Sequence, residues 1–238
     1  MRICGYEKSK ENTKYPTKNE IVNGPKLEID RIFNILFSNQ NKKITKEKFD
    51  NFLKYMKDYE NQLYFLNKIN QDIDKSDDIP KEVFQNLKGI FSFILDLYNI
   101  DNINHEELGI VSLIIILSHS FYYAKRGIIK NKIIYLYEKL KSINIFQNEE
   151  FWKKYLEYII IEEINKQNKN NELNEKQIQK YKRNFAFSPM LNIILYMKNF
   201  GIKKNKIRNI INDSFEKYNI SKENKDSVNS YIEEQMSK

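Results

Sequence analysis

Apolar residues recur at helical spacing along most of the chain from Pro25 onward. A recurrence at i, i+3, i+4 and i+7 predicts amphipathic helices, with segments over about 25–40, 45–69, 80–98, 104–125, 131–143 and 148–165. Three more are predicted over 188–201, 203–218 and 222–236. Six glycines and four prolines are too few for the tight turns of a β-sandwich or barrel. The pattern therefore predicts an all-α protein, a single multi-helix bundle or short irregular α-solenoid of eight to nine helices.

The first 24 residues are polar and end at the turn signal Asn23-Gly24-Pro25. We expect a mobile N-terminal arm over 1–24 and one helical domain over 25–238, with a hydrophilic loop over 166–175. The stretches KIIYLYEKL (132–140) and YIIIEEI (158–164) have strand propensity. The long apolar stripes on either side favour helix for both, so no strand is predicted.

Several helix ends carry readable signals. Thr45 and Asn148 are candidate N-caps, and Ser188 precedes a proline suited to a first helical turn. Lys125-Arg126-Gly127 is typical of a helix C-terminus. Gly201 is expected to close the helix before it in a Schellman motif, with Ile202 contacting Met197.

The stretch LIIILSHSFYYAKRG (113–127) permits three interpretations: a membrane span, a catalytic pair or a buried helix. A spanning helix needs about 20 predominantly apolar residues, and here glycine, serine and histidine interrupt a shorter run. His119 and its serine neighbours point about 100° apart on a helix, so they do not form a working pair. We therefore predict the central helix of the bundle.

Other chemistry is weakly represented. His105-Glu106-Glu107 begins like a zinc-protease motif, but Gly109 stands where the second histidine belongs. The chain has two histidines and one cysteine, too few for a His/Cys zinc site, and it has no glycine-rich phosphate loop. The prediction is a protein that is not an enzyme and needs no cofactor or metal.

The formal net charge is +8, from 40 lysines and arginines against 32 acidic residues. Only five of the basic residues are arginine, and the bias towards Lys, Asn, Ile and Tyr is typical of an AT-rich genome. Exposed charge on an amphipathic helix is the favoured explanation. The alternative is phosphate contact in a lysine-rich region over 180–208. Its candidate residues are Lys182, Arg183, Lys203, Lys204, Lys206 and Arg208.

The single tryptophan, Trp152, and Tyr155 lie on a wide apolar stripe. The favoured interpretation is a large core anchor. The alternative is an aromatic partner-binding site formed by Trp152 and Tyr155, since tryptophan and tyrosine are enriched in binding hot spots.

Three segments carry a resemblance to a known family. They are LIIILSHSFYY (113–123), YLYEKLKSINIFQNEEFWKKYLEYIIIEEI (135–164) and FAFSPMLNIILYMKNFGIKKNKIRNIINDSF (185–215). In order and spacing they resemble the helical module that follows the DENN region in the set-binding-factor group of myotubularin-related pseudophosphatases. The resemblance covers about residues 80–235. It implies a non-enzymatic regulatory module linked to membrane traffic, with a small GTPase or its regulator as partner.

These observations lead to one expected function and one alternative. We expect a non-catalytic helical scaffold that binds another protein; the alternative is a nucleic-acid-binding helical protein that uses 180–208. The lone Cys4 fits a reducing compartment, and residues 1–20 lack the apolar core of a signal peptide. We therefore expect a cytoplasmic protein without a membrane span.

Overall fold

The computed structural model describes residues 18–37, 44–72, 78–125, 132–171 and 187–237, apart from the side chains of 18–23 and 167–171. In these residues it has eleven α-helices, two of them single turns, one short 3-10 helix and one two-stranded sheet. The predicted all-α class is confirmed, and the sheet is an addition to it. The chain divides into two compact units, residues 1–55 and 56–238.

The first unit contains α1 (Lys18–Phe37) and α2 (Lys46–Tyr55), which pack against each other. Thr45 caps α2 as predicted, because its hydroxyl accepts from the Lys48 amide (3.4 Å). The expected turn at Asn23-Gly24-Pro25 is wrong: α1 runs through it, with Pro25 inside the helix. Proline's fixed φ is compatible with a helix, but inside one it removes a hydrogen bond and its ring crowds the carbonyl four residues earlier. Residues 1–17 of the predicted arm lie outside the described residues.

The predicted helix over 45–69 is two helices. The chain leaves α2 at Tyr55, and α3 spans Tyr59–Asp72. Asp58 explains the restart, because its carboxylate accepts from the Asn61 amide (3.1 Å) in the manner of an N-cap. The apolar stripe continues across this break, and periodicity alone therefore did not reveal it.

In the second unit α5 (His105–Ser120) packs against α3, α6 (Tyr137–Leu140) and α8 (Glu149–Asn171). Eight of its sixteen residues are buried, which confirms the predicted central helix. Asn104 and Glu107 form a capping box at its start. α4 (Lys81–Asp96) contacts α6 and the first strand, and the 3-10 turn Ile100–Asn102 leads into α5.

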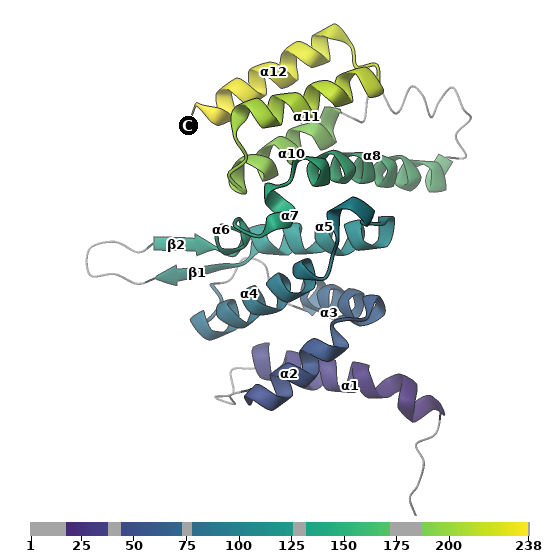
Figure 1. Cartoon of the computed structure of the whole chain (residues 1–238), viewed down its shortest axis with the longest axis vertical. Helices are drawn as coiled ribbons and strands as arrows, with labels where there is room; N and C mark the ends of the chain where they lie inside the picture. The colour runs from purple at the N-terminus through teal and green to yellow at the C-terminus, as the bar shows by residue number, and fades with distance from the viewer. Residues whose placement is uncertain (1–17, 38–43, 73–77, 126–131, 172–186, 238) are drawn as a thin grey trace, which may run out of the picture. The chain divides into compact units, whose positions relative to one another are not determined.

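The predicted stop at Lys125-Arg126-Gly127 is wrong, because α5 ends at Ser120. Near this end, Ser118 and His119 bond back to the Ile115 carbonyl and Ser120 to the Ile116 carbonyl, at 2.8–3.0 Å. Small polar residues in helices commonly bond back to the preceding turn in this way. The helix stops where Phe121 takes extended backbone angles (φ −92°, ψ 134°). The chain then enters β1 (Tyr122–Lys125), which pairs antiparallel with β2 (Lys132–Tyr135) in a hairpin beside α5 and α6 (Figure 1).

After the single turn α7 (Asn144–Gln147), α8 starts at the predicted cap: Asn148 Oδ1 accepts from the Glu150 and Phe151 amides. α8 continues to Asn171, so the loop predicted over 166–175 is wrong for its first six residues. The remaining four, 172–175, lie outside the described residues.

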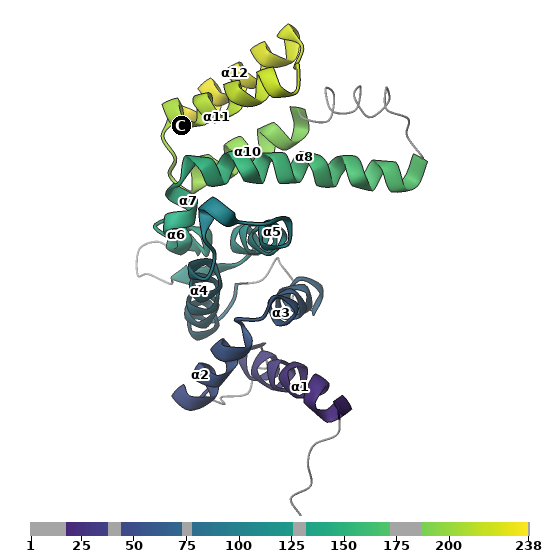
Figure 2. The same ribbon diagram turned by 45° about the vertical axis from the view of Figure 1, so that its right-hand side comes forward.

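The unit ends with α10 (Phe187–Asn199), α11 (Lys204–Lys217) and α12 (Lys222–Met236). α10 and α11 both pack on α8, and α12 lies alongside α11 (Figure 2). The predicted Schellman motif is confirmed: Gly201 has φ 82°, and the Ile202 amide donates to the Met197 carbonyl (2.9 Å). Over the described residues, no helix is both long and apolar enough to cross a membrane.

Candidate interaction surface

Trp152 and Tyr155, the predicted partner-binding pair, are 0% and 1% exposed. Trp152 Nε1–H donates to the Phe146 carbonyl (2.9 Å), and the Tyr155 hydroxyl is hydrogen bonded to Ser112 Oγ (3.2 Å). Burial raises the pKa of Tyr155 well above its ordinary value. Their neighbours are other rings, including Phe151 and Phe200. This arrangement agrees with the favoured interpretation of Trp152 as a core anchor.

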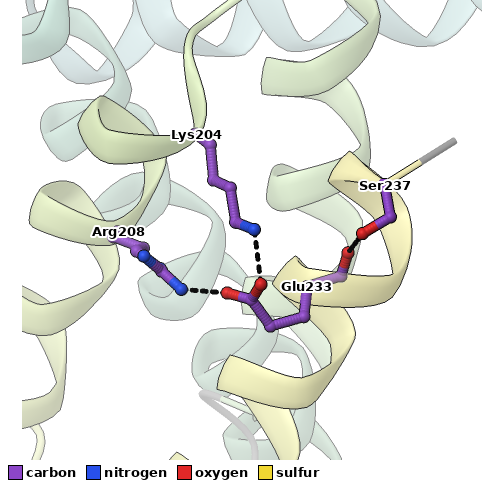
Figure 3. A network of polar contacts seen from close by, with 4 residues as sticks. All are labelled: Lys204, Arg208, Glu233 and Ser237. Atoms are coloured by element: carbon purple, nitrogen blue, oxygen red, sulfur yellow. Dashed lines mark hydrogen bonds and ion pairs between the residues drawn. The ribbon is translucent and has the colours of Figure 1, made fainter.

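Four of the six basic residues predicted to contact phosphate lie at the start of α11: Lys203, Lys204, Lys206 and Arg208. Lys204 and Arg208 both bind the carboxylate of Glu233 on α12 (Figure 3). The hydrogen bond from Lys204, together with the charge of Arg208, lowers the pKa of Glu233. Lys203 is exposed and has no ion-pair partner in the described part of the chain. Lys182 and Arg183 lie outside it.

α8 and α11 face each other with alternating charges. Glu149 pairs with Lys206 (2.8 Å), Lys153 with Asp213 (2.6 Å) and Glu157 with Lys217 (2.7 Å). The hydrogen bond to Asp213 raises the pKa of Lys153. The order along α8 is negative, positive, negative, and α11 has the complement. Three of the four candidate phosphate contacts on α11 are thus paired within the protein.

A different set of side chains forms a continuous surface. We call it the aromatic strip; it consists of Tyr122, Tyr135, Tyr137, His119 and Tyr196, all partly exposed. Successive ring centroids lie 5.8, 5.7, 4.5 and 4.8 Å apart in that order. The rings come from the hairpin, the start of α6, the end of α5 and α10, so the strip links four separate elements.

His119 lies near the middle of the strip. A carbonyl can only accept, so its Nδ1 carries the proton and donates to Ile115 (2.8 Å). Its Nε2 is buried and has no hydrogen-bond partner within the described residues. Burial lowers the pKa of His119 below its ordinary value. The ring stacks on Tyr137 at an interplanar angle of 16°. Burial favours the neutral form of this stacked ring.

The hairpin has one occupied and one open edge. Antiparallel residues alternate between bonding their partner and pointing their N–H and C=O outward. The bond from the Leu136 amide to the Phe121 carbonyl (3.0 Å) sets this alternation, so Tyr122, Ala124, Ile133 and Tyr135 point outward. On the β1 side, Ile79 donates to the Tyr122 carbonyl and Ala124 donates to Asp78 Oδ1. On the β2 side, the outward groups of Ile133 have no hydrogen-bond partner among the residues that the structure describes.

Ile133 extends the aromatic strip. Its side chain is on the same face of β2 as Tyr135, because strand side chains alternate. It is 50% exposed, among the most exposed large apolar side chains of the described residues. The sequence reasoning missed this site because it assigned 122–125 and 132–135 to helices. The available signal was two short aromatic and β-branched runs on either side of Gly127.

His105, singled out as half of a zinc motif, bonds Glu162 Oε1 on α8 (3.0 Å). At the missing second position, a side chain on Gly109 would approach the Tyr158 hydroxyl to 3.2 Å. Across the described residues no group of three His, Cys, Asp or Glu side chains converges on a point. The two residues thus contribute to the α5–α8 contact.

Comparison with known proteins adds no relative. No protein-family model matches the chain, and no curated protein or solved structure matches it. The resemblance to the set-binding-factor module stays a prediction from the sequence.

Proposed function

We propose that the chain is a non-catalytic helical module that binds another protein through the aromatic strip and Ile133. The observation that carries this proposal is the strip itself: five partly exposed rings in an unbroken series, flanked by a half-exposed isoleucine. Tyrosine presents a large apolar area with a polar tip and few rotatable bonds, which is why it is enriched in protein interfaces.

The stacking of the rings favours a protein over a single-stranded nucleic acid. Bases bind proteins by stacking on free aromatic faces. Tyr137 lies nearly parallel to both Tyr135 and His119, at 17° and 16°, with ring centroids 5.7 and 4.5 Å away. These neighbours take up part of the faces of Tyr137, and its edge and hydroxyl group suit contact with the side chains and main chain of a protein.

The ion pairs of α11 support the same choice. A phosphate chain would have to displace Glu233 from Lys204 and Arg208, and Glu149 from Lys206. Each displacement removes a favourable contact and adds a nearby negative charge. Nucleic-acid binding remains the alternative to be tested, with Lys203 as its most accessible contact.

The proposal is tested by capture from an extract of the source cells on the immobilised chain. Ile133→Ser should reduce recovery of the bound protein by about tenfold, the order of a hot-spot truncation. The matched control is Leu97→Ser, because Leu97 is an exposed aliphatic residue outside the strip (40%). Equal recovery with wild type and Ile133→Ser, or equal loss with both variants, would contradict the proposal.

The alternative has its own measurement. Labelled single-stranded DNA and RNA of random sequence are titrated at low and physiological salt, against wild type and a variant with Lys203, Lys204, Lys206 and Arg208 changed to glutamine. Because phosphate binding releases counterions, true nucleic-acid binding weakens steeply with salt and depends on these four residues. That result would favour the nucleic-acid function; salt-insensitive or absent binding supports the protein module.

The finer part of the proposal comes from the sequence resemblance. We propose that the partner is a small GTPase or its regulator, and that the protein acts in the cytoplasm in membrane traffic. The test is binding of the captured protein, identified by mass spectrometry and purified, in its GDP-bound and GTP-bound forms. A partner without nucleotide-binding or GTPase-regulating activity would contradict this part and leave the interaction module intact.

A further inference from the structure

The open edge of β2 offers main-chain groups as well as side chains. Ile133 directs its N–H and C=O away from β1, and within the described residues neither group is hydrogen bonded. The other outward amide of β2 differs, because the Tyr135 N–H donates to Glu138 Oε1 (2.9 Å). The available edge is therefore short and centred on one residue.

Proteins usually protect such edges. Short strands, charged side chains and covering segments are the common devices. β1 has a cover in Asp78 and Ile79, and Glu138 occupies one end of β2. At Ile133, by contrast, the unpaired groups accompany a half-exposed aliphatic side chain. An apolar residue at an uncovered edge position is what a strand-adding partner requires.

The charged side chains beside this edge are positive. Lys125 and Lys132 are directly opposite each other across the hairpin, and both are exposed. Like charges in this arrangement are destabilising, and among the described residues neither lysine has an ion-pair partner. A carboxylate placed next to Lys132 would relieve the repulsion.

We infer that β2 binds an extended segment of the partner by strand addition, with alternating acidic and apolar side chains. The inference rests on the proposed function and specifies the partner's binding element. The residue opposite Ile133 shares its face, where an apolar side chain extends the aromatic strip. The next residue, opposite Lys132, lies on the other face and is acidic.

The probe is a capped, fluorescently labelled peptide of alternating glutamate and valine, followed by anisotropy on the full chain. We expect saturable binding. Ile133→Pro should weaken it by about tenfold or more, because proline removes the outward N–H. Proline is tolerated on an edge strand where its missing N–H faces solvent, so pairing with β1 should persist. Ile133→Val is the matched control and should bind like wild type.

A second measurement guards against misfolding of the proline variant. Two peptides are N-methylated on alternate amides, one on the valines and one on the glutamates, and both are tested on the wild-type chain. In strand addition only one set of amides faces β2, so one peptide should lose binding and the other retain it. Binding of both would overturn strand addition. A lysine–valine peptide that binds as tightly as the glutamate–valine peptide would overturn the acidic preference.

The outcomes separate this inference from the proposed function. Capture of the partner can depend on Ile133 while the peptide binds the Ile133→Pro variant as tightly as wild type, or does not bind at all. In that case strand addition is wrong and the proposed protein-binding function is retained. If the peptide binds as expected but capture is the same for wild type and Ile133→Ser, the edge is active and the proposed function is wrong.

Discussion

Two groups of aromatic residues in the second unit use the same kind of side chain in opposite ways. The buried group, formed by Phe146, Phe151, Trp152, Tyr155 and Phe200, is at most 1% exposed. Every member of the aromatic strip is partly exposed. The buried group is mostly phenylalanine and tryptophan, whereas the strip is mostly tyrosine, whose hydroxyl group can reach water. His119 differs from these tyrosines, because its Nε2 is buried.

The comparison shows that ring size alone is a poor guide to binding. Trp152 is the largest side chain in the chain and drew attention as a possible partner contact, yet its one polar atom bonds an internal carbonyl. Phe200 marks the boundary, because it contacts Phe146 in the buried group (4.0 Å) and His119 in the strip (5.7 Å). The strip therefore rests directly on the core, which holds its rings in place for contact.

The largest expected effect tests the difference in burial. Trp152→Ala should lower the free energy of unfolding by about 3–5 kcal/mol, because it opens a cavity and leaves the Phe146 carbonyl unpaired. Tyr135→Ala, in the strip, should cost only about 1 kcal/mol. Urea unfolding followed by far-UV circular dichroism measures both, since Trp152 fluorescence is lost in the first variant. Similar costs for the two variants would break the comparison.

Most of the fold was readable from the sequence because the helices are amphipathic and capped. Asn148 and Gly201 act at helix ends as their positions predict. The end of α5 was misread because Tyr122–Lys125 continues its apolar pattern. The chain in fact becomes extended at Phe121, whose carbonyl accepts from the Leu136 amide across the hairpin (3.0 Å). Local periodicity does not report such bonds.

The site was less predictable than the fold. His119 was expected on the central helix and not in a catalytic pair, but its stacking with Tyr137 and Tyr196 was not predicted, because residues 122–125 and 131–143 were assigned to helices. The basic residues of α11 were visible in the sequence, but their carboxylate partners are on α8 and α12. Contacts between segments far apart in the sequence therefore determine which side chains remain exposed for binding a partner.

A second, intermediate effect tests the neutral state of His119. Burial lowers its pKa in the folded chain, so between the folded and unfolded pKa values the unfolded chain binds more protons. Neutral His119 makes its full contribution to stability above its pKa in the unfolded chain, about 6.5. This contribution is lost as the pH falls below that pKa, by at most about 1.4 kcal/mol per pH unit. His119→Phe should flatten this dependence between about pH 7.5 and pH 5.

The matched control is His105→Gln, which removes the other histidine. His105 lies outside the strip and bonds Glu162. The rings of Tyr137 and Tyr196 contact His119 and stay neutral in this range, since burial raises both pKa values. Glu138 follows Tyr137 in the chain. If His105→Gln flattens the pH dependence of stability and His119→Phe does not, protonation of His119 does not destabilise the folded chain.

The smallest expected effect concerns the charged face of α8 and α11, which lies outside both aromatic groups. Exposed ion pairs contribute about 0.2–1 kcal/mol, so Glu149→Lys or Lys206→Glu alone should destabilise slightly, and the swapped double variant should recover most of the loss. A double-mutant cycle at low salt, repeated at about 1 M salt where screening is strong, measures the coupling. A coupling as large as the cost of Trp152→Ala would mean that charge, rather than the buried rings, holds these helices together. A small, salt-sensitive coupling would identify the ion pairs as register-setting contacts, since a shift of one turn brings like charges opposite one another.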